Sequence, residues 1–280
     1  MAAALGVDPR TVLDLSASLN PLAPDPATVV GRHLDATHRY PDPTSATAAL
    51  ADAIGVAPNR LVLTNGGAEA IALLAAEIGG SVTEPEFSLH PRGSGPRWRS
   101  NPHNPTGRLS DADETAGVWD EAFFPLATGR WTRGDEGVPV VGSLTKLFAC
   151  PGLRLGYLIA DPALAAAVRR RQAHWSVNGM AVAALPDFLK SADLVGWAAG
   201  IADLRGRLVE LLSAHGLDPL PSDANFVLCR HAAGLRDRLI PHRVVVRDCA
   251  SFGLPGHARV AVPDEGGLER LSAALERSGS

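Results

Sequence analysis

Lysine is almost absent from this chain: among its 26 lysines and arginines, only Lys146 and Lys190 are lysines. Arginine therefore serves wherever a cation is sufficient, and a retained lysine indicates a place that needs a primary amine. The alternative is that one of the two lysines lies near a turn by chance. The residues around Lys146 have to decide between these two interpretations.

Cysteine is also scarce. The three cysteines, Cys150, Cys229 and Cys249, are odd in number and far apart. This usage argues against a disulfide framework and fits a reducing compartment. The cysteines also lack the spacing of zinc ligands, so no metal site is expected.

Long apolar runs and a strong net charge are missing as well. No segment is long enough to span a bilayer, and the N-terminus MAAALGVDPRTVL lacks a basic stretch followed by an apolar run. A formal net charge of −4 gives no reason to expect nucleic acid or an anionic membrane as partner. We therefore expect a soluble, cytoplasmic protein whose partner is a small molecule.

The 280 residues, 46% of them hydrophobic, are enough to bury a sizeable core. Apolar strand-like runs alternate with helix-like stretches, which favours α/β layers, and the last third has the pattern of a smaller α+β domain. We expect an N-terminal arm (1–43), a large domain (44–175) and a small domain (176–280). The proline-rich arm is predicted to be extended, with turns.

The local pattern predicts the individual elements. Asp161 and Pro162 have the positions of a helix cap and a first-turn residue. Residues 81–108 are predicted to be a loop, because they show little periodicity. Helices are predicted over 44–54, 68–79, 161–173 and within 179–215, and strands over 61–64, 118–124, 138–142, 155–160, 224–230, 243–248 and 258–262.

Two motifs before Lys146 carry groups that suit a phosphorylated aromatic aldehyde. The sequence NGGAEA places Gly67, Ala68 and Glu69 between a strand and a helix, where free backbone N–H groups favour a phosphate. A tight turn with no ligand is the alternative. The turn NPHNPTG supplies Asn104, whose amide can bond a ring oxygen.

Two further motifs complete the set. WDEAF places Asp120 at the end of an apolar strand, where a carboxylate can pair with a protonated ring nitrogen. A helix cap or a turn residue is the alternative for an isolated aspartate. SLTK followed by PGLRLGY adds Ser143 and Arg154 as a further phosphate clamp around the amine of Lys146.

In their order along the chain, these motifs resemble those of the fold-type I pyridoxal-phosphate enzymes, in the aminotransferase class I and II group. The resemblance runs from Asn20 to about Val262. It implies a three-layer large domain with a mostly parallel sheet, a smaller α+β domain, pyridoxal phosphate as cofactor and a homodimer with shared active sites. Relatives carry additional strands and helices where this chain is short, after Phe87 and after Ser110, so a reduced sheet is expected.

The resemblance also implies roles for single residues. Lys146 would form a Schiff base with the cofactor, which arginine cannot do, and would then shuttle protons. Asp120 would keep the pyridine nitrogen protonated, so that the ring acts as an electron sink. The other implied contacts are Asn104 with the phenolic oxygen, Ala68, Ser143 and Arg154 with the phosphate, Tyr40 with the phosphate from the other subunit, Phe87 stacked on the ring, and Arg259 with the substrate carboxylate.

The segments DLSASLNPLAP, RYPDP and RRRQAHWSVN are similar to those of the threonine-phosphate decarboxylase and histidinol-phosphate aminotransferase branch. The first expectation is a decarboxylase of L-threonine O-3-phosphate, or a related phospho-amino acid, in cobalamin biosynthesis. The second is an aminotransferase acting on histidinol phosphate or another amino acid. Asn20 and Ser18 are expected at the substrate, although the branch often has asparagine where Ser18 stands. A third interpretation is a degenerate protein of this fold without turnover, and retention of the whole motif set argues against it.

Overall fold

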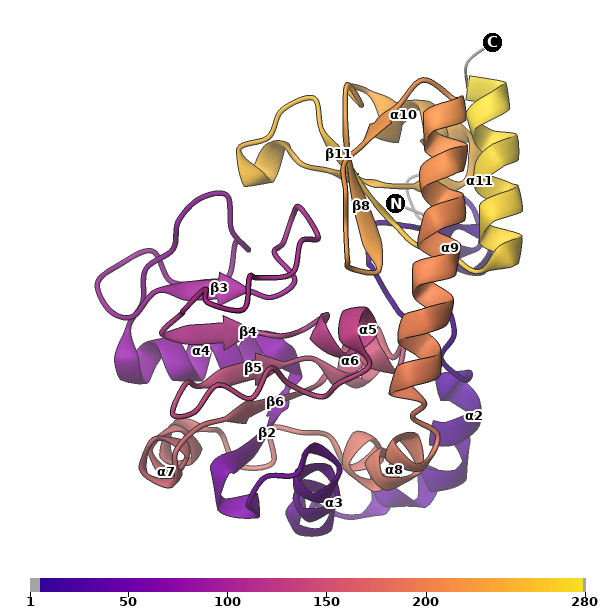
Figure 1. Ribbon diagram of the computed structural model, residues 1–280. Helices are drawn as coiled ribbons and strands as arrows, with labels where there is room; N and C mark the ends of the chain where they lie inside the picture. Colours follow the sequence, from indigo (N-terminus) through magenta and orange to yellow (C-terminus); the bar gives the residue numbers. More distant parts are fainter. Residues whose placement is uncertain (1–5, 279–280) are drawn as a thin grey trace.

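The computed structural model describes residues 6–278 and contains two packing units that share one long helix, α9 (Leu194–Ala214) (Figure 1). Residues 1–5 of the predicted arm lie outside the described residues. Within residues 6–278 no helix is both long enough and apolar enough to cross a membrane.

The larger unit is built on a five-stranded sheet with the strand order β2-β6-β5-β4-β3. Strand β6 runs antiparallel to both of its neighbours, and the other four strands share one direction. The reduced, mostly parallel sheet expected from the sequence is thereby confirmed. The strands are β2 (Leu61–Asn65), β3 (Trp98–Ser100), β4 (Val118–Asp120), β5 (Val140–Gly142) and β6 (Leu155–Ile159).

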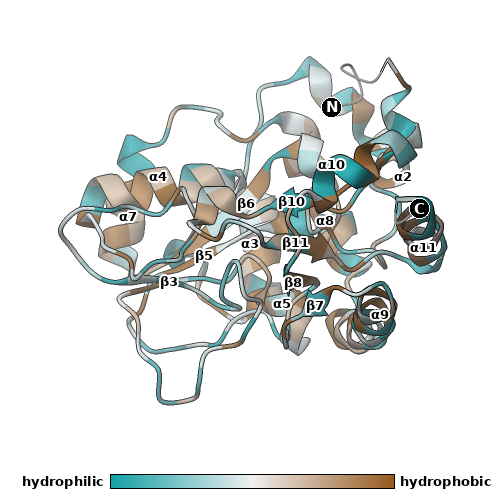
Figure 2. Cartoon of the chain, turned by 90° about the horizontal axis from the view of Figure 1, so that it is seen from above, coloured by the Kyte–Doolittle hydropathy of each residue, from teal (hydrophilic) through white to brown (hydrophobic). Residues whose placement is uncertain are grey.

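Helices cover both faces of this sheet, because alternate apolar residues of each strand point to opposite sides. Val62, Val141 and Leu158 contribute to a core with α4 (Gly66–Ile78) and α7 (Pro162–Arg171), which lie side by side in Figure 2. The core on the opposite face includes residues of α9 and of a helix of the N-terminal arm, together with residues of α3 (Thr44–Ile54), α5 (Phe124–Thr128), α6 (Leu144–Leu147) and α8 (Gly179–Lys190).

The smaller unit has an antiparallel sheet with the order β10-β11-β8-β7, packed against α9 and two further helices. Leu268, Leu271 and Leu275 of the last helix follow helical spacing and are buried in this core, beside α9 (Figure 2). The elements are β7 (Asp218–Pro219), β8 (Phe226–Arg230), α10 (Leu235–Leu239), β10 (Arg247–Asp248), β11 (Ala258–Ala261) and α11 (Glu265–Ser278).

Some local predictions are confirmed and others are wrong. The Asp161 side chain accepts hydrogen bonds from the N–H groups of Ala163 and Leu164 and so caps α7 as predicted. The arm is not simply extended, since it contains α2 (Pro26–Val30) and a 3-10 helix (Gly31–His38), and α2 starts on an aspartate cap followed by proline. The loop predicted over 81–108 contains β3, whose three residues are too few to show a period.

Three predicted boundaries also change. The strand predicted over 118–124 ends at Asp120, and α5 begins at Phe124. The helical stretch within 179–215 is two helices, α8 and α9, separated by three residues. The strand predicted over 243–248 is divided between two sheets: β9 (Val244–Val245) pairs in parallel with β1 (Leu13–Asp14), and β10 pairs with β11.

The change from one packing unit to the other occurs along α9. Trp197 and Ile201 belong to the core of the larger unit, whereas Leu204, Leu208 and Leu212 belong to the core of the smaller one. The N-terminal strand β1 packs with the smaller unit. Helix α8 packs with the larger unit, although the sequence analysis placed it in the small domain, which was predicted to begin at residue 176. The limits of the three predicted domains stay a prediction.

Candidate active site

The strands of the large sheet bring their ligand-binding ends to one edge. Strands β2, β4 and β5 end there at Asn65, Asp120 and Gly142, and the antiparallel β6 begins there at Leu155. Ligands of open α/β sheets bind at the carboxyl ends of the parallel strands. A cavity of about 310 Å³ lies at this edge and is closed on its other side by residues of the small unit.

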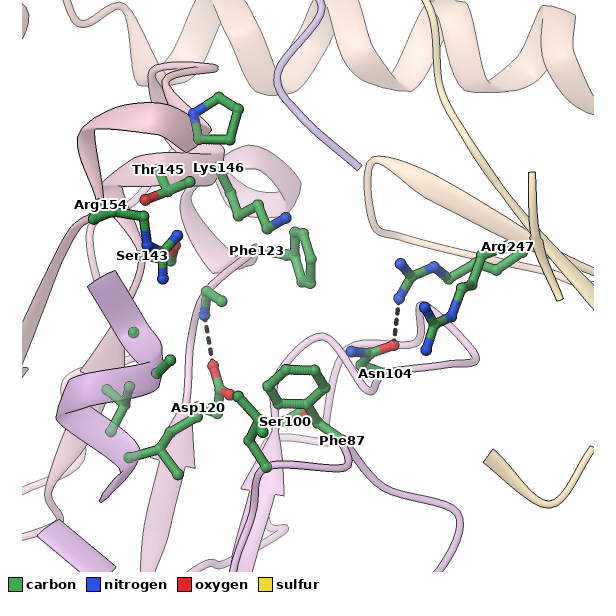
Figure 3. A pocket seen from close by; sticks show the side chains of 18 of the residues that line it. Phe87, Ser100, Asn104, Asp120, Phe123, Ser143, Thr145, Lys146, Arg154 and Arg247 are labelled. Carbon is green, nitrogen blue, oxygen red and sulfur yellow. Dashed lines mark hydrogen bonds between the residues drawn. The ribbon is translucent and has the colours of Figure 1, made fainter. Parts of the chain in front are cut away.

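Most of the predicted site residues meet in this cavity (Figure 3). The predicted residues that line it are Gly67, Ala68, Phe87, Asn104, Asp120, Ser143, Lys146, Arg154 and Arg259. Residues that the sequence did not single out also line it, among them Leu89, Ser100, Phe123, Thr145, Arg247 and Phe252. The convergence of these side chains is a structural finding, and their individual roles stay predictions.

Lys146 lies near the middle of the cavity. It belongs to the one-turn helix α6, whose Leu144 and Leu147 are buried in the core, so that the lysine is directed to the cavity. Its Nζ donates a hydrogen bond to the carbonyl oxygen of Ala17, 2.7 Å away. Burial, together with nearby arginines, lowers the pKa of Lys146 to about 8. A larger fraction of this amine than of an ordinary lysine is therefore unprotonated and nucleophilic near neutral pH.

An anion cradle lies on one side of Lys146. Helix α4 begins at Gly66 with φ +78°, and its first backbone N–H groups have no acceptor within the helix. A Cβ atom at Gly66 would lie 2.5 Å from Nη2 of Arg154, so the guanidinium rests against the start of the helix. Among residues 6–278 no hydrogen bond or ion pair engages that guanidinium.

The position of Arg154 is fixed through its neighbours. Its backbone is left-handed, with φ 55°, a conformation that is uncommon outside glycine and that concentrates at functional sites. The Thr145 hydroxyl bonds both the N–H and the carbonyl oxygen of Leu155, at 3.2 and 3.0 Å. Thr145 and Leu155 adjoin Lys146 and Arg154 in sequence, so this buried pair holds the amine and the guanidinium together.

Asp120 supplies a carboxylate below Lys146 (Figure 3). It is only 6% exposed, and its Oδ1 accepts a hydrogen bond from the N–H of Ala122 at 3.0 Å. Its Oδ2 lies 2.8 Å from Nε2 of His90, which is fully buried. Sequence reasoning did not find His90, because it is a single histidine in a segment without periodicity. The contacts with His90 and with the N–H of Ala122 thus fix the Asp120 carboxylate beside the cavity.

Two arginines lie on the opposite side of the cavity. Arg259 is 7% exposed and donates to Oδ1 of Asn104 at 2.6 Å and to the carbonyl oxygen of Ser16 at 3.1 Å. Burial lowers its pKa to about 10. Arg247, which the sequence did not single out, faces Arg259 directly across the β10–β11 pair. Within the described part of the chain, neither arginine has a carboxylate partner.

Two predicted cofactor residues lie outside the cavity lining. Tyr40 is 79% exposed and stacks on Trp175 with ring centroids 4.4 Å apart. This position is compatible with a contact to another subunit, which stays a prediction. The Glu69 carboxylate accepts a hydrogen bond from the N–H of Asn65 at 2.7 Å and so supports the start of α4.

The two predicted substrate residues of the arm lie next to the site without lining the cavity. Nδ2 of Asn20 donates to the carbonyl oxygen of Leu147 at 2.9 Å, and its Oδ1 accepts from the N–H of Leu22. Ser18 is fully buried in a left-handed conformation with φ 48°, and its hydroxyl has no partner among the described residues. Both contacts with substrate stay predictions.

The donor set fits the cofactor implied by the motifs. A phosphate matches the cradle at Arg154, a ring nitrogen matches Asp120, and an aldehyde matches the amine of Lys146 between them. Phe87 and Ile71 provide apolar walls for a flat ring. Residues 6–278 contain no cluster of three or more histidine, cysteine or acidic side chains able to hold a metal ion. Fold and cavity thus define an α/β protein suited to a phosphorylated aldehyde cofactor.

The chain belongs to the aminotransferase class I and II family, whose model matches residues 98–275. This match confirms the resemblance to the aminotransferase class I and II group that was inferred from the sequence motifs. Membership of this family indicates pyridoxal phosphate as the cofactor.

Two curated relatives differ in their reactions. The chain is 30% identical to histidinol-phosphate aminotransferase 1 of Dechloromonas aromatica over 238 residues, which cover 76% of this chain and 64% of the relative. It is 36% identical to the threonine-phosphate decarboxylase of Salmonella typhimurium over 201 residues, 62% of this chain and 55% of that protein. The chain thus spans less than two thirds of the length of either relative.

A solved structure shows the same fold. The histidinol-phosphate aminotransferase of Sinorhizobium meliloti, in complex with pyridoxal-5'-phosphate, superimposes with a TM-score of 0.85 at 20% identity. The match covers 99% of this chain and 93% of that one. The predicted fold class, a large α/β unit with a smaller α+β unit, is confirmed.

Replacing Gly66 with alanine should weaken cofactor binding. The new Cβ would displace the Arg154 guanidinium, and alanine at φ +78° costs roughly 1–2 kcal/mol. We expect at least about tenfold weaker binding of pyridoxal phosphate in an absorbance titration, because a charge-assisted hydrogen bond is worth roughly 1.5–3 kcal/mol. Gly55→Ala is the matched control, since its backbone has a similar left-handed φ of +83°, its Cβ would meet no atom within 4 Å, and it does not line the cavity. If Gly66→Ala and the parent bind pyridoxal phosphate with equal affinity, the start of α4 and Arg154 do not form the phosphate site.

Pyridoxal phosphate followed by borohydride should label Lys146 and leave Lys190 unlabelled, as read by peptide mapping. The yield at Lys146 should rise with pH and level off above about 8, because only the unprotonated amine attacks an aldehyde. Lys190 is the internal control: it lies on the surface, 3.2 Å from Asp187. Label that is absent from Lys146, or equal on both lysines, would exclude Lys146 as the cofactor lysine.

Proposed function

We propose that this protein is a pyridoxal-phosphate-dependent enzyme that decarboxylates L-threonine O-3-phosphate or a related phospho-amino acid. The observation that carries the proposal is the placement of the Lys146 amine between Arg154, in the anion cradle, and Arg247 (Figure 3). Arg259 lies directly opposite Arg247 in the β10–β11 pair and also lines the cavity. One end of the cavity suits the phosphate of the cofactor. The other end suits the anionic groups of a substrate.

The residues of the chain have separate tasks in this proposal. Bound pyridoxal phosphate supplies an electron sink for the bonds at the substrate α-carbon. Arg154, Ser143 and the start of α4 hold its phosphate, and Asp120 holds a proton at its ring nitrogen. Lys146 would hold the cofactor at its aldehyde group and would move a proton to or from the substrate α-carbon.

The arginine pair supports an anionic substrate. The two guanidiniums belong to directly opposed residues of an antiparallel strand pair, and like charges in such positions repel. No carboxylate of the described chain offsets this repulsion. A phospho-amino acid carries a carboxylate and a phosphate, and arginine binds both in a planar, two-point geometry.

Decarboxylation and transamination begin in the same cavity and differ in the bond that breaks. In decarboxylation the bond between the α-carbon and the carboxylate breaks, carbon dioxide leaves, and a proton takes its place on the α-carbon. In transamination the α-carbon would instead lose its proton and exchange its amino group for an oxygen, and a keto acid such as 2-oxoglutarate would take up the amino group. The second candidate is therefore an aminotransferase for histidinol phosphate or another amino acid, which the relative from Dechloromonas aromatica supports.

Product analysis distinguishes the candidates. Protein loaded with pyridoxal phosphate is incubated with L-threonine O-3-phosphate, and in parallel with histidinol phosphate and 2-oxoglutarate. We expect carbon dioxide and aminopropanol phosphate in equal amounts from the first mixture. Glutamate from the second mixture without carbon dioxide from the first would establish the aminotransferase instead. Absence of turnover with every amino acid tested would favour the degenerate protein.

Arg259→Lys should lower kcat/KM strongly while cofactor binding survives. Lysine keeps the charge but loses the two-point grip, and removing one partner of a buried charged pair costs about 2–5 kcal/mol. Arg230→Lys is the matched control, because Arg230 lies in the same sheet with an exposed side chain paired to Asp218. If Arg259→Lys has unchanged kinetics with every amino acid, Arg259 does not bind the substrate carboxylate. This result would favour an amine substrate such as histidinol phosphate.

We also propose a homodimer with shared active sites. Tyr40 is exposed, is held by Trp175, and lies outside the cavity of its own chain. In a dimer it is available to the cofactor phosphate of the partner subunit. The mass of the protein in solution during turnover decides this point, and a catalytically active monomer would contradict it.

A further inference from the structure

His90 forms a buried link between Asp120 and a second carboxylate. Its side chain has no exposed surface, and its Nε2 lies 2.8 Å from Oδ2 of Asp120. On the other side of the ring, Nδ1 faces Oε1 of Glu86 at 3.8 Å, and the Glu86 side chain is 1% exposed. Within residues 6–278, Nδ1 makes no hydrogen bond. The imidazole is thus enclosed between two acidic side chains.

The Glu86 carboxylate is held by several hydrogen bonds. Its Oε1 accepts hydrogen bonds from the N–H of Phe87 at 3.0 Å and from the Ser100 hydroxyl. Its Oε2 accepts from the N–H of Ser100 at 3.1 Å and lies 3.9 Å from the guanidinium of Arg99. Several donors directed at one carboxylate stabilise its ionised form.

The geometry favours a proton on both nitrogens of His90. A carboxylate can only accept, so Nε2 carries the hydrogen that Asp120 receives. A bare Nδ1 would direct a lone pair at the Glu86 carboxylate, and the buried site offers it no donor. A proton on Nδ1 removes this conflict and places a cation between two anions, where Coulomb attraction is strong because water is excluded.

Other charges around His90 are arranged in pairs. Arg92 donates to the His90 backbone carbonyl at 2.8 Å and pairs with Glu84 at 2.7 Å. On the β3 side, Arg99 pairs with Glu114 at 2.9 Å. The aromatic rings of Phe87 and Trp98 fill the rest of the surroundings, each with its centroid 5.6 Å from the imidazole. Besides Asp120, Glu86 is therefore the carboxylate in contact with the ring.

We propose that Glu86 is a positioning residue that keeps His90 as an imidazolium, and that His90 in turn holds Asp120 as an anion toward the cavity. The contribution of Glu86 to the reaction rests on the function proposed for Asp120. The protonation of His90 does not, because it follows from the three side chains alone. The competing explanation is that Glu86 only ties its segment to β3 through Ser100.

Nitrogen-15 NMR of the histidine rings at pH 7 tests this proposal in the cofactor-loaded protein, because the imidazolium and the neutral tautomers give different patterns. His90→Gln assigns the signal among the nine histidines. We expect both nitrogens of His90 to be protonated in the parent. In Glu86→Gln we expect the loss of the Nδ1 proton, together with a lower kcat at little-changed KM.

Two matched variants separate charge from structure. Asp113→Asn removes an exposed carboxylate that does not contact the ring, and it should leave both protons in place. Ser100→Ala removes the hydroxyl tie but keeps the Glu86 charge, and it should also leave the Nδ1 proton. Loss of that proton in Ser100→Ala as well would favour the structural explanation.

The parent spectrum alone can overturn the proposal. An unprotonated Nδ1 of His90 at pH 7 contradicts it even where Glu86→Gln does not fold. The same spectrum of the cofactor-free protein separates this inference from the proposed function. Suppose that His90 is doubly protonated but that pyridoxal phosphate does not bind to Lys146. The protonation of His90 beside Glu86 would then be supported, and the proposed enzymatic function would be refuted.

Discussion

The excess of positive charge in one cavity is the constraint on which the site depends. Four cationic side chains line it, and Asp120 is the single carboxylate among the lining residues. Two of these cations donate to neutral oxygens: Lys146 to the Ala17 carbonyl, and Arg259 to Asn104 and the Ser16 carbonyl. Such contacts do not neutralise the charge, and burial lowers the pKa of both Lys146 and Arg259. Anionic ligands complete the electrostatics of the cavity, which ties its chemistry to phosphates and carboxylates.

The N-terminal segment that supplies the Ser16 and Ala17 carbonyl oxygens also joins the two packing units. Its strand β1 pairs with β9 of the small unit, and Asn225 of the small unit donates to the carbonyls of Ser18 and Leu19. A few residues further on, the N–H of Asn20 donates to the Lys146 carbonyl in the large unit at 3.1 Å. The segment therefore touches both the amine-bearing turn and the Arg259 strand. A shift between the units would change the surroundings of both cations at once, because one short stretch of backbone serves both.

The sequence was sufficient for the parts of the site that lie in continuous motifs. Each of NPHNPTG, WDEAF and SLTK to Arg154 lies at the end of a strand or directly after it, so the functional side chain and the turn that directs it stand in one continuous stretch of sequence. Contacts that depend on the register of paired strands, or on backbone without regular secondary structure, could not be predicted from the sequence. Arg247 meets Arg259 only because β10 pairs with β11 in one particular register. His90 reaches Asp120 through a segment that has no period, and the helical part of the arm was hidden by its prolines.

The site is complete although the sheet is short, because the site residues lie only at the carboxyl ends of its parallel strands. Asn65, Asp120 and Gly142 end three parallel strands at that edge, and antiparallel β6 begins there, directly after Arg154. Strand β3 lies at the border of the sheet, where the irregular segment before it adds a single parallel bridge, between Ser81 and Arg97. That segment also carries Phe87 into the cavity and His90 beneath Asp120. An irregular segment can do this only if buried hydrogen bonds fix it, and the bonds between Glu86 and Ser100 are among those that do. The same carboxylate that anchors the segment to the sheet thus faces the histidine beneath the site.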